Sequence, residues 1–151
     1  MQDYKIEWCL TLLDKYSTII FEKQLNTLTK TQMLFMIHLK HRPGIHQDQL
    51  AIMFKTNRST VTRAIDQLID KGYVLKKVDQ DNRKANVLLL TESGDKAYIE
   101  IMEAVDHYVE ILTKGMSEEE KLLSMKLLSH MAGNVCEYLG DTHLSRLIRG
   151  E

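Results

Sequence analysis

Residues 55–94 decide the fold and read KTNRSTVTRAIDQLIDKGYVLKKVDQDNRKANVLLLTESG. The first half has a polar, hydroxyl-rich start at Asn57, apolar residues at helical spacing, and a glycine at Gly72. Asparagine is a favoured N-cap residue, and glycine favours the left-handed conformation that closes a helix. Two strand-like runs, 73–78 and 85–90, then flank a charged turn. The stretch therefore predicts a helix followed by a β-hairpin.

The polar start of this helix suits contact with DNA. A helix that reads the major groove needs short donors and acceptors near its N-terminus. Arg63 can hold a guanine edge through two hydrogen bonds, and the hydroxyl groups can meet phosphates or bases. The candidate DNA-binding residues of the helix are Asn57, Arg58, Ser59, Thr60, Thr62 and Arg63. The alternative is an ordinary polar face in contact with solvent.

The hairpin adds a cation at its predicted tip. Arg83 lies in the charged turn, and a guanidinium there can enter a narrow minor groove, where the negative potential is strongest. Asp81 would orient it through a charge-assisted pair. Lys76, Lys77 and Lys84 would attract phosphates without regard to sequence. The alternatives are a surface ion pair that stabilises the turn by less than about 1 kcal/mol, and lysines on a solvated strand.

Charge is distributed unevenly along the chain. The 151 residues carry a formal net charge of −1, which by itself is weak support for a nucleic-acid partner. Residues 55–86 contain eight basic and four acidic residues, a net charge of +4. Residues 92–130 contain four basic and nine acidic residues, a net charge of −5. Because phosphate contacts depend on the local patch, this separation favours DNA binding by the first segment.

The rest of the chain predicts helices. Apolar residues at spacings of three and four indicate a helix over residues 3–25. Residues 29–32 match a capping box, which opens a second helix that ends before Pro43. A short third helix is expected over 45–54. Two long helices follow the hairpin, and a second capping box at Ser117 opens the last of them. We therefore expect a mainly α chain with six helices and one hairpin.

Composition disfavours several other classes of protein. No run approaches the roughly 18 apolar residues of a membrane helix, and the first residues lack an apolar signal core, so we expect neither a membrane partner nor export. Two widely separated cysteines suit a reducing cytoplasm. The sequence lacks a glycine-rich phosphate loop, a nucleophile elbow and a metal-protease motif, so we expect no enzyme and no cofactor.

Six segments stand in a specific order and spacing, although each is weak alone: Leu28–Gln32, Gln49–Ala51, Asn57–Arg63, Leu68–Val74, Asp81–Ala85 and Leu90–Gly94. With this ordered set, the chain resembles the MarR family of bacterial winged-helix regulators over nearly its whole length. One departure is His46, which stands where the family more often has a hydroxyl cap.

The resemblance implies a fold and a mechanism. Residues 1–151 would form one unit, an α+β winged helix-turn-helix lobe over 28–94, with helices over 1–27 and 95–151 forming the interface of a homodimer. The dimer would bind a palindromic operator in double-stranded DNA and act as a repressor that a small-molecule effector releases. Aromatic residues that could line an effector pocket are Trp8, Tyr16, Phe21 and Phe35. At helical spacing, such residues are alternatively core.

Two further hypotheses concern sensing, and a third replaces DNA binding. One branch of the family senses peroxides with a cysteine in its first helix, but Cys9 has no adjacent base to stabilise a thiolate, which favours a buried small hydrophobe. Cys136 is interpreted in the same way. His38, His41 and His46 could bind a metal, although no cysteine or paired carboxylate nearby completes a tetrahedral set. Finally, winged helices sometimes serve as protein-interaction or dimerisation modules.

Overall fold

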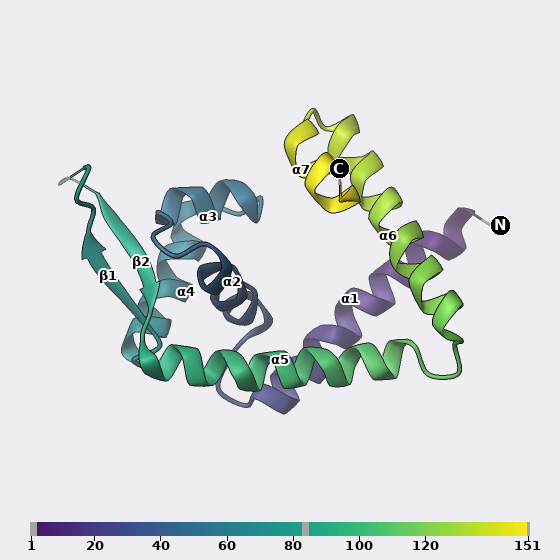
Figure 1. Cartoon of the computed structure of the whole chain (residues 1–151), viewed down its shortest axis with the longest axis horizontal. Coiled ribbons are helices and arrows are strands. Elements are labelled where there is room, and N and C mark those ends of the chain that lie inside the picture. Colours follow the sequence, from purple (N-terminus) through teal and green to yellow (C-terminus); the bar gives the residue numbers. More distant parts are fainter. Residues whose placement is uncertain (1–2, 83–84, 151) are drawn as a thin grey trace. The chain divides into compact units, whose positions relative to one another are not determined.

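The computed structural model describes residues 3–82 and 85–150, which form helices and one small antiparallel sheet (Figure 1). The elements are, in order, α1 (Asp3–Leu25), α2 (Lys30–His41), α3 (Gln47–Met53), α4 (Arg58–Asp70), β1 (Val74–Val78), β2 (Asn86–Leu90), α5 (Glu92–Leu112), α6 (Glu118–Tyr138) and α7 (Thr142–Arg149). The mainly α fold with a two-stranded hairpin is confirmed. The expected count of six helices is wrong, because the described residues form seven.

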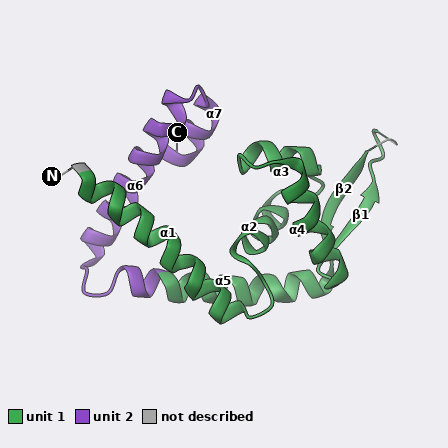
Figure 2. Cartoon of the chain, turned by 180° about the vertical axis from the view of Figure 1, so that it is seen from behind, with its two compact units in different colours: residues 1–108 green, residues 109–151 purple. Residues whose placement is uncertain are grey.

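The chain divides into two compact units, residues 1–108 and 109–151 (Figure 2). The first unit contains α1 to α4, the hairpin and most of α5, and the second contains α6 and α7. The division predicted from the sequence, a DNA-binding lobe over 28–94 with flanking dimerisation helices, separates the chain by function and not by compact units. It stays a prediction.

The core of the first unit lies among α2, α3, α4, the hairpin and α5. Its fully buried large side chains include Phe35 and Leu39 from α2, Leu50 from α3 and Leu68 from α4. Each such side chain stabilises the folded state by roughly 1.5–3 kcal/mol relative to exposure. The apolar stripe predicted for α4 is therefore confirmed as the face that turns inward.

Capping residues define the N-termini of α2 and α6 at the positions predicted from the sequence. The Thr29 hydroxyl accepts a hydrogen bond from the Gln32 amide at 3.2 Å, and the Gln32 side chain accepts one from the Thr29 amide at 3.1 Å. Ser117 and Glu120 form the same reciprocal pair at the start of α6. Both capping boxes satisfy amide groups that have no partner inside the helix, as predicted.

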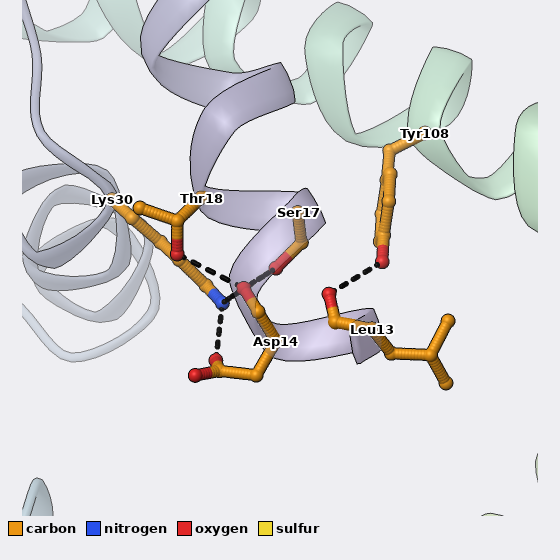
Figure 3. Close-up of polar contacts among 6 residues, drawn as sticks. All are labelled: Leu13, Asp14, Ser17, Thr18, Lys30 and Tyr108. Carbon is orange, nitrogen blue, oxygen red and sulfur yellow. Dashed lines mark hydrogen bonds and ion pairs between the residues drawn. The ribbon is translucent and has the colours of Figure 1, made fainter. Parts of the chain in front are cut away.

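Polar contacts hold the middle of α1 to its neighbours within the first unit (Figure 3). The Lys30 ammonium lies 2.7 Å from Asp14 Oδ1 and 2.6 Å from Ser17 Oγ. The Tyr108 hydroxyl of α5 donates to the Leu13 carbonyl at 3.3 Å. The hydrogen bond from Lys30, with its charge, lowers the pKa of Asp14. These contacts fix α1 against α2 and α5.

The junction between the hairpin and α5 is tightly packed. The Thr91 hydroxyl donates to the Gly72 carbonyl at 2.6 Å and accepts from the Gly94 amide at 3.0 Å. The Thr91 amide donates to the Tyr73 carbonyl at 3.0 Å. A Cβ added to Gly94 would overlap that same Tyr73 carbonyl oxygen. Only glycine therefore lets the first turn of α5 approach the start of β1.

Beyond the end of α5, the second unit contains two packed helices, α6 and α7, of which α7 was not predicted from the sequence. Asp141 caps α7 by accepting a hydrogen bond from the Leu144 amide at 3.2 Å. Arg149 crosses α6 at the buried Gly133 and donates to Asn134 at 2.7 Å and Glu137 at 3.0 Å. A helix of eight residues is too short to show clear periodicity, so its stability depends on this packing.

Large parts of α1 and α6 leave apolar side chains exposed. All side chains from residue 4 to residue 10 are exposed, including Trp8 and Cys9. On α6, the exposed apolar residues are Leu122, Leu123, Met125, Leu127, Leu128, Met131, Val135 and Tyr138. Cys9 is thus exposed, contrary to the sequence-based interpretation of a buried small hydrophobe. In the part of the chain that the structure describes, no helix is long and apolar enough to cross a membrane.

Substitution Gly94→Ala should lower the free energy of unfolding by about 3 kcal/mol, because a methyl group forced against a backbone carbonyl displaces well-packed structure. Chemical denaturation at one fixed protein concentration measures the change. Ser93→Ala, at an exposed position in the same helical turn, is the control and should stay within about 0.5 kcal/mol of the wild type. Equal stability of the two variants would contradict the role assigned to Gly94.

Candidate nucleic-acid interface

The polar face of α4 is exposed along its first two turns. Arg58, Ser59, Thr60 and Arg63 are exposed and Thr62 is half-buried, whereas Val61, Ala64, Ile65 and Leu68 are buried. The apolar stripe thus turns the polar residues outward. Arg58, Ser59, Thr62, Arg63, Asp66, Gln67 and Asp70 line an open depression of about 780 Å³ along this face.

Asn57 defines where α4 begins. Its side-chain oxygen accepts hydrogen bonds from the Thr60 amide at 2.8 Å and from the Ser59 hydroxyl at 2.7 Å. The predicted N-cap is therefore confirmed, and it also fixes the rotamer of Ser59. The Ser59 oxygen keeps its acceptor capacity, so it can still receive a hydrogen bond from a ligand. Asn57 itself holds the helix start in place.

Two residues of α4 are tied to α3. Arg58 lies 3.1 Å from the carboxylate of Asp48, and both side chains are exposed. Gln47 contacts the Thr62 hydroxyl at 3.5 Å, the upper limit for a hydrogen bond. Because α3 contacts α4 at its exposed polar end, both helices of the helix-turn-helix can meet one surface. To contact DNA, Arg58 would have to break its ion pair with Asp48. Because this pair is exposed, breaking it costs little free energy.

The hairpin lies against α4 and carries further cations. Lys76 of β1 lies 3.0 Å from the carboxylate of Asp66 on α4, so this lysine joins the strand to the helix. Lys77 is exposed. Figure 1 shows the hairpin beside α4, with the end of β1 and the start of β2 directed away from α5. The structure thus brings the predicted strand lysines and the α4 residues into one region.

The turn of the hairpin is organised by Asp79. Its Oδ1 accepts a hydrogen bond from the Asp81 amide at 2.9 Å, and its own amide donates to the Ala85 carbonyl at 3.0 Å. Asp81 is exposed. Arg83 and Lys84, both predicted to contact DNA, lie outside the described residues. Their roles, and the Asp81–Arg83 pair, stay predictions.

Sequence reasoning missed the residues that hold the hairpin to the rest of the lobe. Ile45 pairs with Leu88 of β2, and the Gly44 amide donates to the Leu88 carbonyl at 3.0 Å. The His46 ring contacts the Asn86 carbonyl through Nδ1 and the Asp79 carboxylate through Nε2, both at 3.1 Å. Isolated residues before α3 carry no strand pattern, and only the unusual histidine at the helix start could have drawn attention to them.

The other candidate residues are dispersed. Trp8 and Tyr16 are exposed on α1, while Phe21 packs against Tyr108 and Phe35 against Phe54, each at 5.0 Å between ring centroids. The effector pocket assigned to these residues stays a prediction.

The histidines and Cys136 have separate surroundings. His38 packs edge-on against Phe54, and its burial, with Arg42 and His41 nearby, lowers its pKa. His41 contacts the Tyr98 hydroxyl at 3.3 Å, and Cys136 is half-buried. Across residues 3–82 and 85–150, no three side chains of histidine, cysteine, aspartate or glutamate gather as a metal site would require.

A helix-turn-helix followed by a β-hairpin, with the polar face of the second helix exposed, defines a winged-helix protein. The sequence profile described as "MarR family" matches residues 28–85. The uncharacterised HTH-type transcriptional regulator YybA of Bacillus subtilis (strain 168) is 37% identical over 123 residues, which cover 82% of this chain and 81% of that protein.

Solved structures with a similar fold include regulators described as MarR proteins. A MarR transcriptional regulator from Methanosarcina mazei Go1 superimposes with a TM-score of 0.84 at 26% identity, over 89% of this chain and 99% of that one. A MarR family regulator from Listeria monocytogenes, solved with a 26mer DNA and described as putative, has a TM-score of 0.72 at 28% identity, over 98% and 94% of the two chains. This chain belongs to the MarR family of transcriptional regulators, which share a DNA-binding winged-helix fold.

Substitution Asn57→Ala should destabilise the protein by about 1 kcal/mol, because it leaves an amide at the start of α4 without its acceptor. Urea denaturation at constant protein concentration measures the loss. Asn57→Asp keeps an acceptor in the same place and should restore most of the stability. If the alanine variant were as stable as wild type, the cap would not contribute to the position of α4.

Proposed function

We propose that this protein is a homodimeric repressor that binds a palindromic operator in double-stranded DNA. One α4 enters each of two successive major grooves, about 34 Å apart, and the hairpins reach the adjacent minor grooves. The observation that carries the proposal is the exposed polar face of α4, with Ser59, Thr60 and Arg63 outward. Short hydroxyl groups and a guanidinium at this end of a helix match the donors and acceptors of base edges and phosphates.

The apolar faces of α1 and α6 support the homodimer. Ile6, Trp8 and Leu10 on α1 are between 43% and 55% exposed, and Leu122 and Val135 on α6 are at least 60% exposed. Monomeric proteins rarely leave such extended apolar surface in water, because covering it is favourable by about 25 cal/mol per Å². A second copy of the chain presents the same helices and can cover them by symmetry.

The solved Listeria relative supports the DNA partner, because that protein was crystallised with a 26mer DNA. Its 28% identity over 98% of this chain makes the same mode of binding the simplest proposal here. A small-molecule effector would then release the DNA only to the extent that it binds another subunit arrangement more tightly. The rival proposal is a winged helix that pairs or contacts other proteins without binding DNA.

Selection of bound sequences from random duplex DNA tests the proposal directly. The enriched sites should be palindromic, with half-site centres about 10–10.5 base pairs apart, since two copies of α4 must face the same side of the duplex. Sedimentation should show a dimer under the same conditions. Enrichment of a single unrepeated half-site would contradict the dimeric mode. A dimer that enriches no duplex would favour the protein-interaction module.

Substitution Arg83→Ala should weaken binding to the selected operator by about 1–3 kcal/mol at fixed salt, the range expected for a specific base contact. Fluorescence anisotropy titration measures the affinity. Arg146→Ala removes the same charge from an exposed position on α7 and is the control. If the two variants lost equal affinity, Arg83 would act only through net charge.

A further inference from the structure

Lys30 joins the first turn of α2 to the middle of α1 (Figure 3). Its ammonium group donates to the Ser17 hydroxyl at 2.6 Å and pairs with Asp14 Oδ1 at 2.7 Å. The Ser17 hydroxyl in turn donates to the Asp14 carbonyl at 2.8 Å. Ser17 is 4% exposed and the Lys30 side chain is 22% exposed, so their hydrogen bond is largely shielded from solvent, while Asp14 is exposed.

A lysine at this position opposes the local preference of a helix start. The free amide groups of the first turn carry partial positive charge, so acidic residues are favoured there and a cation is not. The first turn of α2 contains no acidic residue, and Lys30 is its first residue. A residue that is unfavourable locally indicates a requirement elsewhere in the fold. The contact with α1 meets that requirement, and the hydrogen bond from Lys30, together with its charge, lowers the pKa of Asp14.

A second contact holds the same part of α1. The Tyr108 hydroxyl of α5 donates to the Leu13 carbonyl at 3.3 Å, and the Tyr108 ring packs on Phe21 at 5.0 Å between ring centroids. Over residues 4–25 of α1, the buried side chains are Ser17 and Phe21. Residues four apart lie on one face of a helix. One face of α1 is therefore held to α2 and α5 by a polar contact at one turn and an apolar contact at the next.

The start of α2 is also joined to α4. Gln32 is 3% exposed, and its side-chain amide donates to Gln67 of α4 at 2.7 Å. Leu39 of α2 and Ile65 of α4 lie in the same buried core. Close-packed side chains keep the helices that carry them in one arrangement. An angle fixed between α1 and α2 is therefore also an angle between α1 and α4.

The N-terminal part of α1 extends beyond these contacts. Residues 4–10 are exposed and include apolar side chains that the proposed homodimer would cover. From Asp14 to Ile6, α1 extends about 12 Å, at about 1.5 Å per residue. A tilt of about 15° at Asp14 would displace Ile6 by about 3 Å relative to α4, close to the rise of one base pair, about 3.4 Å. A small change of this angle in each copy would therefore alter the separation of the two paired α4 helices.

We propose that Lys30 is a positioning residue, which with Asp14 and Ser17 fixes the angle between α1 and α4 and thereby the half-site spacing that the dimer accepts. The inference rests on the proposed function, because it requires two copies paired through α1 on one operator. Lys30 acts through α1 and does not itself contact DNA. Without its hydrogen bonds, α1 stays attached through Phe21 and Tyr108 but is no longer held at a single angle.

The first test compares two operators, the selected one and one with a single base pair inserted between its half-sites. Lys30→Met keeps the length of the side chain and removes its donors. It should bind the selected operator about fivefold more weakly than wild type, a modest effect suited to a partly exposed charged contact, and should discriminate less between the two spacings. Lys40→Met is the matched control, because Lys40 also lies on α2 but pairs with Asp95 of α5 at 2.8 Å.

A second measurement needs no DNA. Arg63 is exposed on α4, so Arg63→Cys accepts a spin label in a chain whose two cysteines are replaced by serine. Pulsed electron paramagnetic resonance then measures the distance between the two copies of α4 in the dimer. Wild type should give one narrow distance, Lys30→Met a broader distribution, and Lys40→Met the wild-type result.

Tyr108→Phe provides a second variant, which keeps the ring on Phe21 and loses only the hydroxyl. It should broaden the same distance distribution. Either an unchanged distribution or unchanged spacing discrimination in Lys30→Met would overturn the role of Lys30, as would equal broadening in Lys40→Met. A monomer would contradict the proposed homodimer and this inference together. A dimer that binds no duplex, but whose distance distribution broadens in Lys30→Met, would contradict the DNA-binding function alone and support the positioning role.

Discussion

The orientation of the polar face of α4 depends on burial of the apolar stripe of the same helix. Val61, Ile65 and Leu68 have no exposed surface, and they pack with α2 and α3. Because side chains on a helix repeat every 3.6 residues, burying this stripe turns Ser59 and Arg63 outward. Rotation of α4 would expose three large apolar side chains, each at a cost of roughly 1.5–3 kcal/mol. The core therefore orients the polar residues, and no polar contact needs to do so.

Most polar contacts around this surface serve to align its parts. Asn57 fixes the start of α4, Lys76 joins β1 to Asp66, and Thr91 links the hairpin to α5. Each of these contacts is modest in energy, and together they leave the hairpin and helix with one relative arrangement. In the proposed complex with DNA, such alignment would favour binding, because ordering the hairpin after binding would cost affinity.

Helices α1 and α6 differ from α4 in that their apolar side chains are not all turned inward. In α1 and α6, many large apolar side chains are exposed, including Trp8 and Leu122. This pattern is typical of chains whose core is completed by association. The exposed apolar faces of α1 and α6 therefore support the proposed homodimer, in which a second copy of the chain would cover them.

The sequence by itself determined the local structure. Capping boxes at Thr29 and Ser117, the Asn57 cap and the hairpin were predictable, because each depends on residues a few positions apart. It did not reveal α7, which is stabilised by Arg149 crossing Gly133, or the exposure of Cys9. Nor did it reveal the contact of His46 with Asp79, 33 positions apart in the numbering. Only the tertiary structure decides such contacts, because they arise when distant segments pack on a common core.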